Sequence, residues 1–118
     1  MGLFSFGRKK LEDGFEFVID GAYALKGNSA VATGKLTRGR LIPGTEAVCL
    51  NALGEPVFKC RITGIEQGTK LLRAASYDMK GTYGAHYGFK LDGVTKEQIP
   101  AEGAVLVSVT EELEEALK

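Results

Sequence analysis

Hydrophobic and polar positions alternate in several short stretches of the chain. Phe15, Phe17 and Ile19 take every second position of the first stretch, which predicts a half-buried strand. Sixteen glycines separate the stretches, and this arrangement is typical of short strands joined by tight turns. We therefore expect further strands at residues 31–36, 45–51, 57–65, 84–91 and 104–109.

Helical spacing is clear only at the end of the chain. Leu113, Ala116 and Leu117 share one helical face, and Thr110 is suited to cap its start. Residues 70–75 fit either a brief helical turn or a loop. At least six strands with so little helix predict an all-β fold. We expect a small closed antiparallel β-barrel of about six to eight strands, with a tail at 1–13, the barrel at 14–109 and a short C-terminal helix at 110–118.

Length and charge narrow the possible functions. The chain has 118 residues, with 15 Lys and Arg balanced by 15 Asp and Glu, so only a local basic face is available for nucleic acid. No apolar run is long enough to span a bilayer, and the start does not resemble a secretory signal. We expect a cytoplasmic protein. Residues 1–10 place three bulky apolar residues before three cations, a combination found in membrane-surface contacts, but a disordered tail is our preferred interpretation.

Two cysteines are too few for a disulfide scaffold or a zinc site. Val48 and Leu50 fit core positions, which predicts that Cys49 points outward. The alternation of Phe58 and Cys60 predicts that Cys60 points inward. On opposite faces the two thiols cannot form an unstrained disulfide, so we expect two reduced structural cysteines.

Four segments, in order, resemble the second domain of the translational GTPases, the barrel domain of elongation factor Tu and its relatives. They are residues 27–39, 41–48 and 84–94, followed by Ile99 with residues 103–106. The resemblance extends from about Phe15 to Ser108 and implies the same closed barrel. The chain departs from the family at Ser29, where the first loop usually has a second glycine.

Glycines account for much of this resemblance. Strand turns favour glycine because it adopts positive φ angles without strain, and glycine within a strand marks a bulge or tight bend. We assign such structural roles to Gly34, Gly39, Gly44, Gly84, Gly88 and Gly93. Because these roles need no ligand, the motif predicts fold rather than activity.

No catalytic constellation is apparent. The chain lacks the phosphate-binding loop Gly-x-x-x-x-Gly-Lys-Ser/Thr, so we expect no nucleotide hydrolysis. His86 is the only histidine and has no further ligands at metal-binding spacing. The resemblance makes His86 a candidate contact, because the matching segment of elongation factor Tu lies near the pocket for the aminoacyl end of tRNA. The alternative is an ordinary strand histidine. We expect no enzyme activity, no metal and no cofactor.

Basic residues offer a better lead to function. Strand alternation directs Lys35, Lys59 and Arg61 outward, and such arrays bind backbone phosphates. Tyr77, Tyr83 and Tyr87 are candidates for stacking on unpaired bases. The candidate RNA- or partner-binding residues are Lys35, Arg38, Arg40, Lys59, Arg61 and His86.

The resemblance suggests tRNA, ribosomal RNA or a translation-related protein as the partner of this non-catalytic binding module. Acidic residues are interleaved with the basic ones, however. The alternative is therefore a protein-interaction or self-associating module with no nucleic-acid role.

Overall fold

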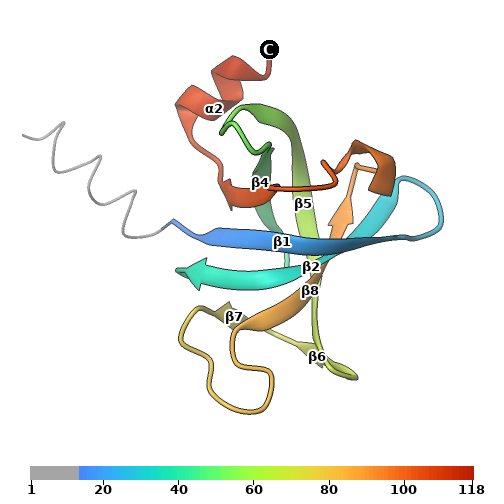
Figure 1. The fold of residues 1–118 in the computed structure, drawn as a ribbon, viewed down its shortest axis with the longest axis vertical. Coiled ribbons are helices and arrows are strands. Elements are labelled where there is room, and N and C mark those ends of the chain that lie inside the picture. The colour runs from blue at the N-terminus through green and yellow to red at the C-terminus, as the bar shows by residue number, and fades with distance from the viewer. Residues whose placement is uncertain (1–13) are drawn as a thin grey trace, which may run out of the picture.

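Six antiparallel strands pair in a ring in the computed structural model, which describes residues 14–118. Figure 1 shows how they are arranged. The strands are β1 (Glu16–Ala24), β2 (Ser29–Arg38), β4 (Thr45–Leu50), β5 (Pro56–Gln67), β8 (His86–Asp92) and β9 (Val105–Ser108). Their order is β4-β9-β1-β2-β8-β5, and β5 returns to β4. Closure leaves these strands without the unpaired edges of an open sheet. The predicted all-β barrel is confirmed.

The remaining strands and helices are short. β3 (Arg40–Leu41) and β7 (Ala75–Ser76) form a separate two-stranded sheet, η1 (Lys96–Gln98) is a 3-10 turn, and α2 (Glu111–Ala116) is the C-terminal helix. β6 (Lys70–Leu72) pairs with the end of β5. The prediction of a helical turn or loop at 70–75 was therefore wrong. The chain reverses at Gly68, whose φ is +63°, and the next residues extend the hairpin.

Aromatic residues occupy the middle of the barrel. The rings of Phe17 and Phe89 stack with centroids 4.1 Å apart, and Tyr87 follows at 5.9 Å from Phe89. Around them pack the fully buried aliphatic side chains of Leu36, Ile62, Leu91 and Leu106. Inward positions alternate with exposed ones along β5 and β8, so the period of two in the sequence is the pattern of burial in the barrel.

β1 and β2 approach very closely at one position. A Cβ atom at Gly34 would lie 2.0 Å from the carbonyl oxygen of Val18, a distance that no side chain can occupy. The register of the pair also shifts between Ile19 and Gly21. Glycine at position 34 thus allows the bend that brings these two strands together.

Cys49 points into the barrel, contrary to the prediction. Cys49 and Cys60 are both free thiols. Both belong to the same core cluster, which also contains Ala47. Val48 lies between the inward residues Ala47 and Cys49 and outside the core cluster, yet it is fully buried. The reason for the error is that β4 is covered on both faces, so hydrophobicity alone does not show which side is the barrel interior.

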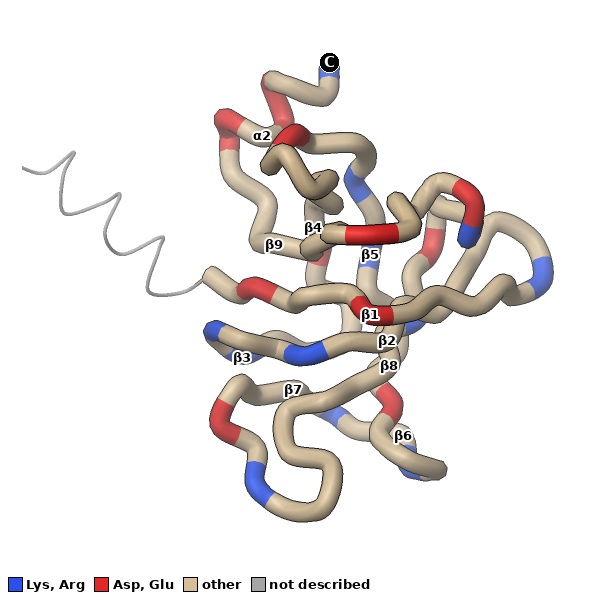
Figure 2. The backbone as a smooth tube through the Cα atoms, in the orientation of Figure 1, with Lys and Arg blue, Asp and Glu red and all other residues tan. Residues whose placement is uncertain are grey.

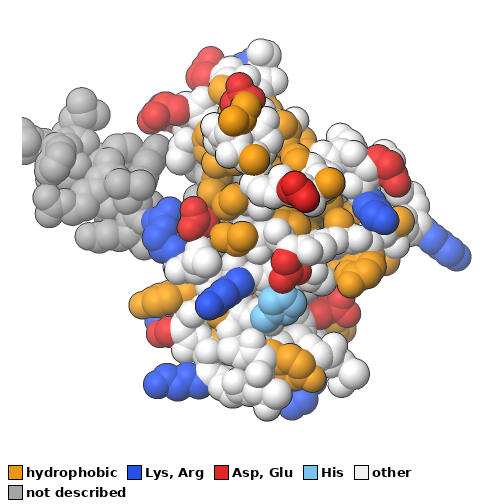
Figure 3. All heavy atoms as spheres, viewed as in Figure 1, with side chains coloured by type: hydrophobic (Ala, Val, Ile, Leu, Met, Phe, Trp, Pro, Cys, Tyr) orange, Lys and Arg blue, Asp and Glu red, His pale blue; other side chains and the backbone are white. Residues whose placement is uncertain are grey.

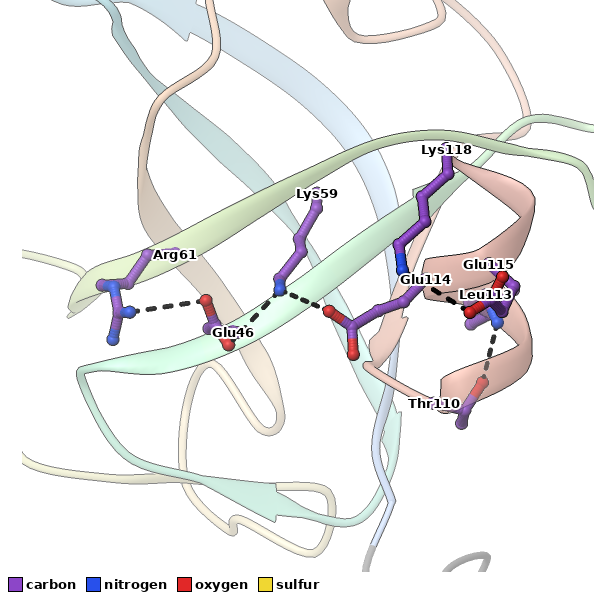
Figure 4. A network of polar contacts seen from close by, with 8 residues as sticks. All are labelled: Glu46, Lys59, Arg61, Thr110, Leu113, Glu114, Glu115 and Lys118. Atoms are coloured by element: carbon purple, nitrogen blue, oxygen red, sulfur yellow. Dashed lines mark hydrogen bonds and ion pairs between the residues drawn. The ribbon is translucent and has the colours of Figure 1, made fainter.

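The helix α2 packs against β5, whose Lys59 lies in register with Val48 of β4. The Thr110 hydroxyl accepts a hydrogen bond from the Leu113 amide at 3.2 Å, which confirms Thr110 as the N-cap. Lys59 of β5 reaches Glu114 of the helix at 2.8 Å (Figure 4). Among residues 14–118, no helix is long and apolar enough to cross a membrane. The predicted tail at 1–13 lies outside the described residues.

Candidate RNA-binding and partner-binding surfaces

The six predicted contact residues fall into two groups on the barrel. Lys35 of β2 lies directly opposite His86, the first residue of β8, and Arg38 and Arg40 follow Lys35 in the chain. Figure 2 shows basic positions in blue along β2. Arg61 of β5 lies opposite Asp92, the last residue of β8. The two ends of β8 are separated by about 20 Å of extended chain. One continuous site containing all six residues is therefore not present.

The β5 group is neutralised by acidic neighbours (Figure 4). Lys59 lies 2.8 Å from Glu114 and 3.7 Å from Glu46, and Arg61 lies 3.4 Å from Glu46. Arg61 also donates to the carbonyl oxygen of Gly44 at 2.9 Å. The bond to Glu114 raises the pKa of Lys59 and lowers that of Glu114. These contacts fasten the helix to the barrel and leave no local excess of positive charge.

The second group contains His86 and a set of three basic residues, Lys35, Arg38 and Arg40, which we call the β2–β3 edge. All three side chains are exposed. Arg40 lies 3.1 Å from Asp78 and also above the ring of Tyr77, 5.7 Å from its centroid. Lys35 has no ion pair or side-chain hydrogen bond to any residue of 14–118. This edge is the more basic of the two groups.

Asp78 is held beside Arg40 by its own loop. The Ser76 hydroxyl donates to Asp78, and this bond, followed by the charge of Arg40, lowers the pKa of the Asp78 carboxyl. Asp78 thus stays ionised at neutral pH and partly offsets the charge of Arg40. Both side chains are more than half exposed, at 67% and 51%, so their ion pair contributes little to stability.

His86 is a surface histidine with a fixed partner. Its Nε2 atom lies 2.7 Å from Asp20, which also accepts a hydrogen bond from Thr33 at 2.7 Å. The Thr33 bond and then the His86 bond lower the pKa of Asp20. Figure 3 shows this sole histidine in pale blue on the surface that faces the viewer. In the described part of the chain, no three His, Cys, Asp or Glu side chains are grouped to hold a metal ion.

Two of the three candidate stacking tyrosines are available to a ligand. Tyr77 and Tyr83 are 49% and 57% exposed. Tyr87 is only 1% exposed, and its hydroxyl accepts from the Ser76 amide and donates to the Ser76 carbonyl. The prediction that Tyr87 stacks on a base was wrong. Its position on β8 between two outward residues directs the ring into the core.

Two grooves open on the surface formed by residues 14–118, and neither was predicted from the sequence. The larger, of about 770 Å³, is mostly apolar and lies between β3, β7 and the start of β1, where Phe15, Ile42 and Met79 line it. The smaller, of about 320 Å³, lies beside His86 and contains Tyr23 and Tyr83. The signal in the sequence for the second groove was a glycine inside a strand, Gly88, which we had assigned only a structural role.

No protein-family model matches the chain. Among solved structures, the chain is similar to translation elongation factor SelB from Methanococcus maripaludis in its apo form, with a TM-score of 0.68 and 21% sequence identity. The match covers 91% of this chain but only 24% of SelB, so the chain spans about a quarter of the length of that factor. At this identity the likeness establishes the fold. The predicted resemblance to the barrel domain of translation elongation factors is thereby confirmed.

Proposed function

We propose that the chain is a non-catalytic module that binds RNA, or an RNA-containing component of the translation machinery, through the β2–β3 edge. The observation that supports this most is the run of Lys35, Arg38 and Arg40 along one edge, with the exposed ring of Tyr77 beneath Arg40. Lysine and arginine bind phosphates irrespective of sequence, while an exposed tyrosine stacks on an unpaired base.

The Arg40–Asp78 ion pair does not oppose this role. It is largely exposed, and an exposed pair contributes at most about 1 kcal/mol, so a phosphate can replace Asp78. The contact between Arg40 and Tyr77 then places the guanidinium group and the aromatic ring next to each other, as a nucleotide requires. His86 of β8 lies opposite Lys35 and can contact the same RNA chain there.

Variants that neutralise the cations of each group test this proposal. Binding of a fluorescent tRNA and of an unstructured oligonucleotide is measured at low salt for Lys35→Gln/Arg38→Gln/Arg40→Gln. The control is Lys59→Gln/Arg61→Gln, which removes cations already paired with acids. Circular dichroism checks that both variants are folded.

We expect the edge variant to bind at least about tenfold more weakly, with a salt slope reduced by about 2 to 3. The control should retain most of the affinity. Absence of binding by the unaltered protein at low salt, or equal losses in the two variants, would exclude the edge as an RNA site.

The larger groove favours a second candidate function, a protein-interaction or self-associating module. Ile42 at its rim is 61% exposed, and exposed apolar surface in a groove is typical of protein interfaces. Sedimentation velocity over a range of protein concentrations tests self-association. A dimer that dissociates on Ile42→Ser would support this function, whereas a monomer at every concentration would leave only a different protein as the partner.

We further propose that the chain acts in the cytoplasm. We also propose that it hydrolyses no nucleotide, because the sequence has no phosphate-binding loop. Release of phosphate from GTP at a rate proportional to the concentration of the purified protein would contradict the proposal that it hydrolyses no nucleotide.

A further inference from the structure

The smaller groove is formed where β8 lacks a side chain on its outer face. Gly88 lies in register with Thr33 of β2 on one side and with Glu66 of β5 on the other. A Cβ atom at Gly88 would lie 3.4 Å from Val31 and 3.8 Å from the Glu66 carboxylate. Because glycine has no side chain to fill this space, the outer surface of the sheet is recessed at Gly88. The groove at this position measures about 320 Å³.

Two exposed aromatic side chains line this groove. Tyr23 of β1 pairs in register with Val31 and is 62% exposed. Tyr83, 57% exposed, packs its ring over Gly68, where a Cβ would lie 3.1 Å from the ring. Within residues 14–118, stacking involves only the core rings, so Tyr23 and Tyr83 do not stack on each other. Both rings are therefore available to a ligand in the groove.

The groove also contains a carboxylate without a partner. Glu66 lines it and makes no ion pair or side-chain hydrogen bond with any residue of 14–118. The neighbouring acid, Asp20, is already shared by Thr33 and His86. Lys90, two positions beyond Gly88, does not line the groove. Two aromatic rings and an uncompensated negative charge thus surround one small space.

We propose that this groove binds a methylated ammonium group, with Tyr23 and Tyr83 around the cation and Glu66 as its counter-charge. Aromatic faces attract cations, and quaternary ammonium ions are favoured because they lose little hydration on binding. A metal ion would need further oxygen ligands, whereas a fully methylated, quaternary ammonium group has no N–H and needs no hydrogen-bond acceptor. The proposal does not depend on RNA binding, since Tyr23, Glu66 and Tyr83 are not part of the β2–β3 edge.

NMR titration of the full chain with tetramethylammonium chloride tests the proposal. Potassium chloride at equal ionic strength is the first control, and the uncharged carbon analogue of choline is the second. We expect saturable shifts of the backbone amides of Glu66, Gly68 and Gly88 with the quaternary ion alone. Shifts that do not saturate, or equal binding of the uncharged analogue, would overturn the proposal.

Variants then assign the roles of the side chains. Tyr23→Ala, Tyr83→Ala and Glu66→Gln should each raise the dissociation constant by at least about threefold. Tyr77→Ala, a matched loss of an exposed tyrosine outside the groove, should leave it unchanged. Unchanged binding in all three groove variants would refute the assignment even if the ion binds. Titrations with choline and with free trimethyllysine distinguish a small metabolite from a modified side chain, since the true source should bind more tightly than the bare ion.

Discussion

The hydroxyl of Tyr87 connects the barrel core to the sheet formed by β3 and β7. It accepts a hydrogen bond from the Ser76 amide at 3.0 Å and donates one to the Ser76 carbonyl at 2.9 Å. The ring itself lies in the core, 5.9 Å from Phe89. Replacing Tyr87 with Phe removes one oxygen atom and both hydrogen bonds but keeps the aromatic packing.

The expected cost follows from these two bonds. Each contributes about 1 kcal/mol to folding, and more when a partner is left buried without a replacement. Because Ser76 is only half-buried, water can reach part of its backbone, so we expect Tyr87→Phe to lower the free energy of unfolding by about 1–2 kcal/mol. For a domain of this size that corresponds to a fall in Tm of roughly 4–8 °C.

Urea denaturation followed by circular dichroism measures this change. Tyr83→Phe is the matched control, because the Tyr83 hydroxyl makes no hydrogen bond within residues 14–118 and its ring is exposed. The control should remain within about 0.5 kcal/mol of the unaltered protein. If Tyr87→Phe also stayed within that range, the two bonds to Ser76 would not stabilise the fold and our account of Tyr87 would be refuted.

Three further predictions concern the backbone, the thiols and acid stability. Gly34→Ala should destabilise the fold by more than about 2 kcal/mol, because the new Cβ atom would overlap a backbone oxygen. Gly64→Ala is the control, since its Cβ atom meets only an ordinary contact at 3.5 Å. Equal urea midpoints for the two variants would contradict this prediction. Burial raises the pKa of Cys49 to about 11 and that of Cys60 to about 12, so a thiol reagent at pH 8 should react quickly only after denaturation, and rapid reaction of the folded protein would show that the thiols are accessible. The pKa of Asp20 is lowered in the fold, so its stabilising effect is present at neutral pH and is lost as pH falls below about 4. Asp20→Asn should therefore make stability less dependent on pH in that acidic range, and an unchanged pH profile would argue against the bonds to Asp20.

The sequence by itself determined the fold class and most of the strands. Alternation such as that of Phe58, Cys60 and Ile62 reflects a sheet with one face in the core, and each of these residues is buried as predicted. Local chemistry was equally informative at Thr110, where a hydroxyl at the right distance from the next amides caps a helix. Such signals are readable because they involve neighbours in the chain.

Long-range packing decided the remainder. Cys49 faces inward because the register of β4 with β5 and β9 places it opposite the core residues Phe58 and Leu106. β6 formed because its partner strand β5 was adjacent. The candidate basic residues form two groups because they lie near opposite ends of β8. Glu114, contributed by the C-terminal helix, then neutralises Lys59 in one of these groups.

The smaller groove arose in the same way, since its residues come from β1, β2, β5, β8 and the loops between strands. Neither Tyr23 nor Glu66 has a sequence context that indicates a site. Only the register of three strands across Gly88 brings them together. The alternating pattern specified which side chains face outward, and barrel closure decided which of them became neighbours.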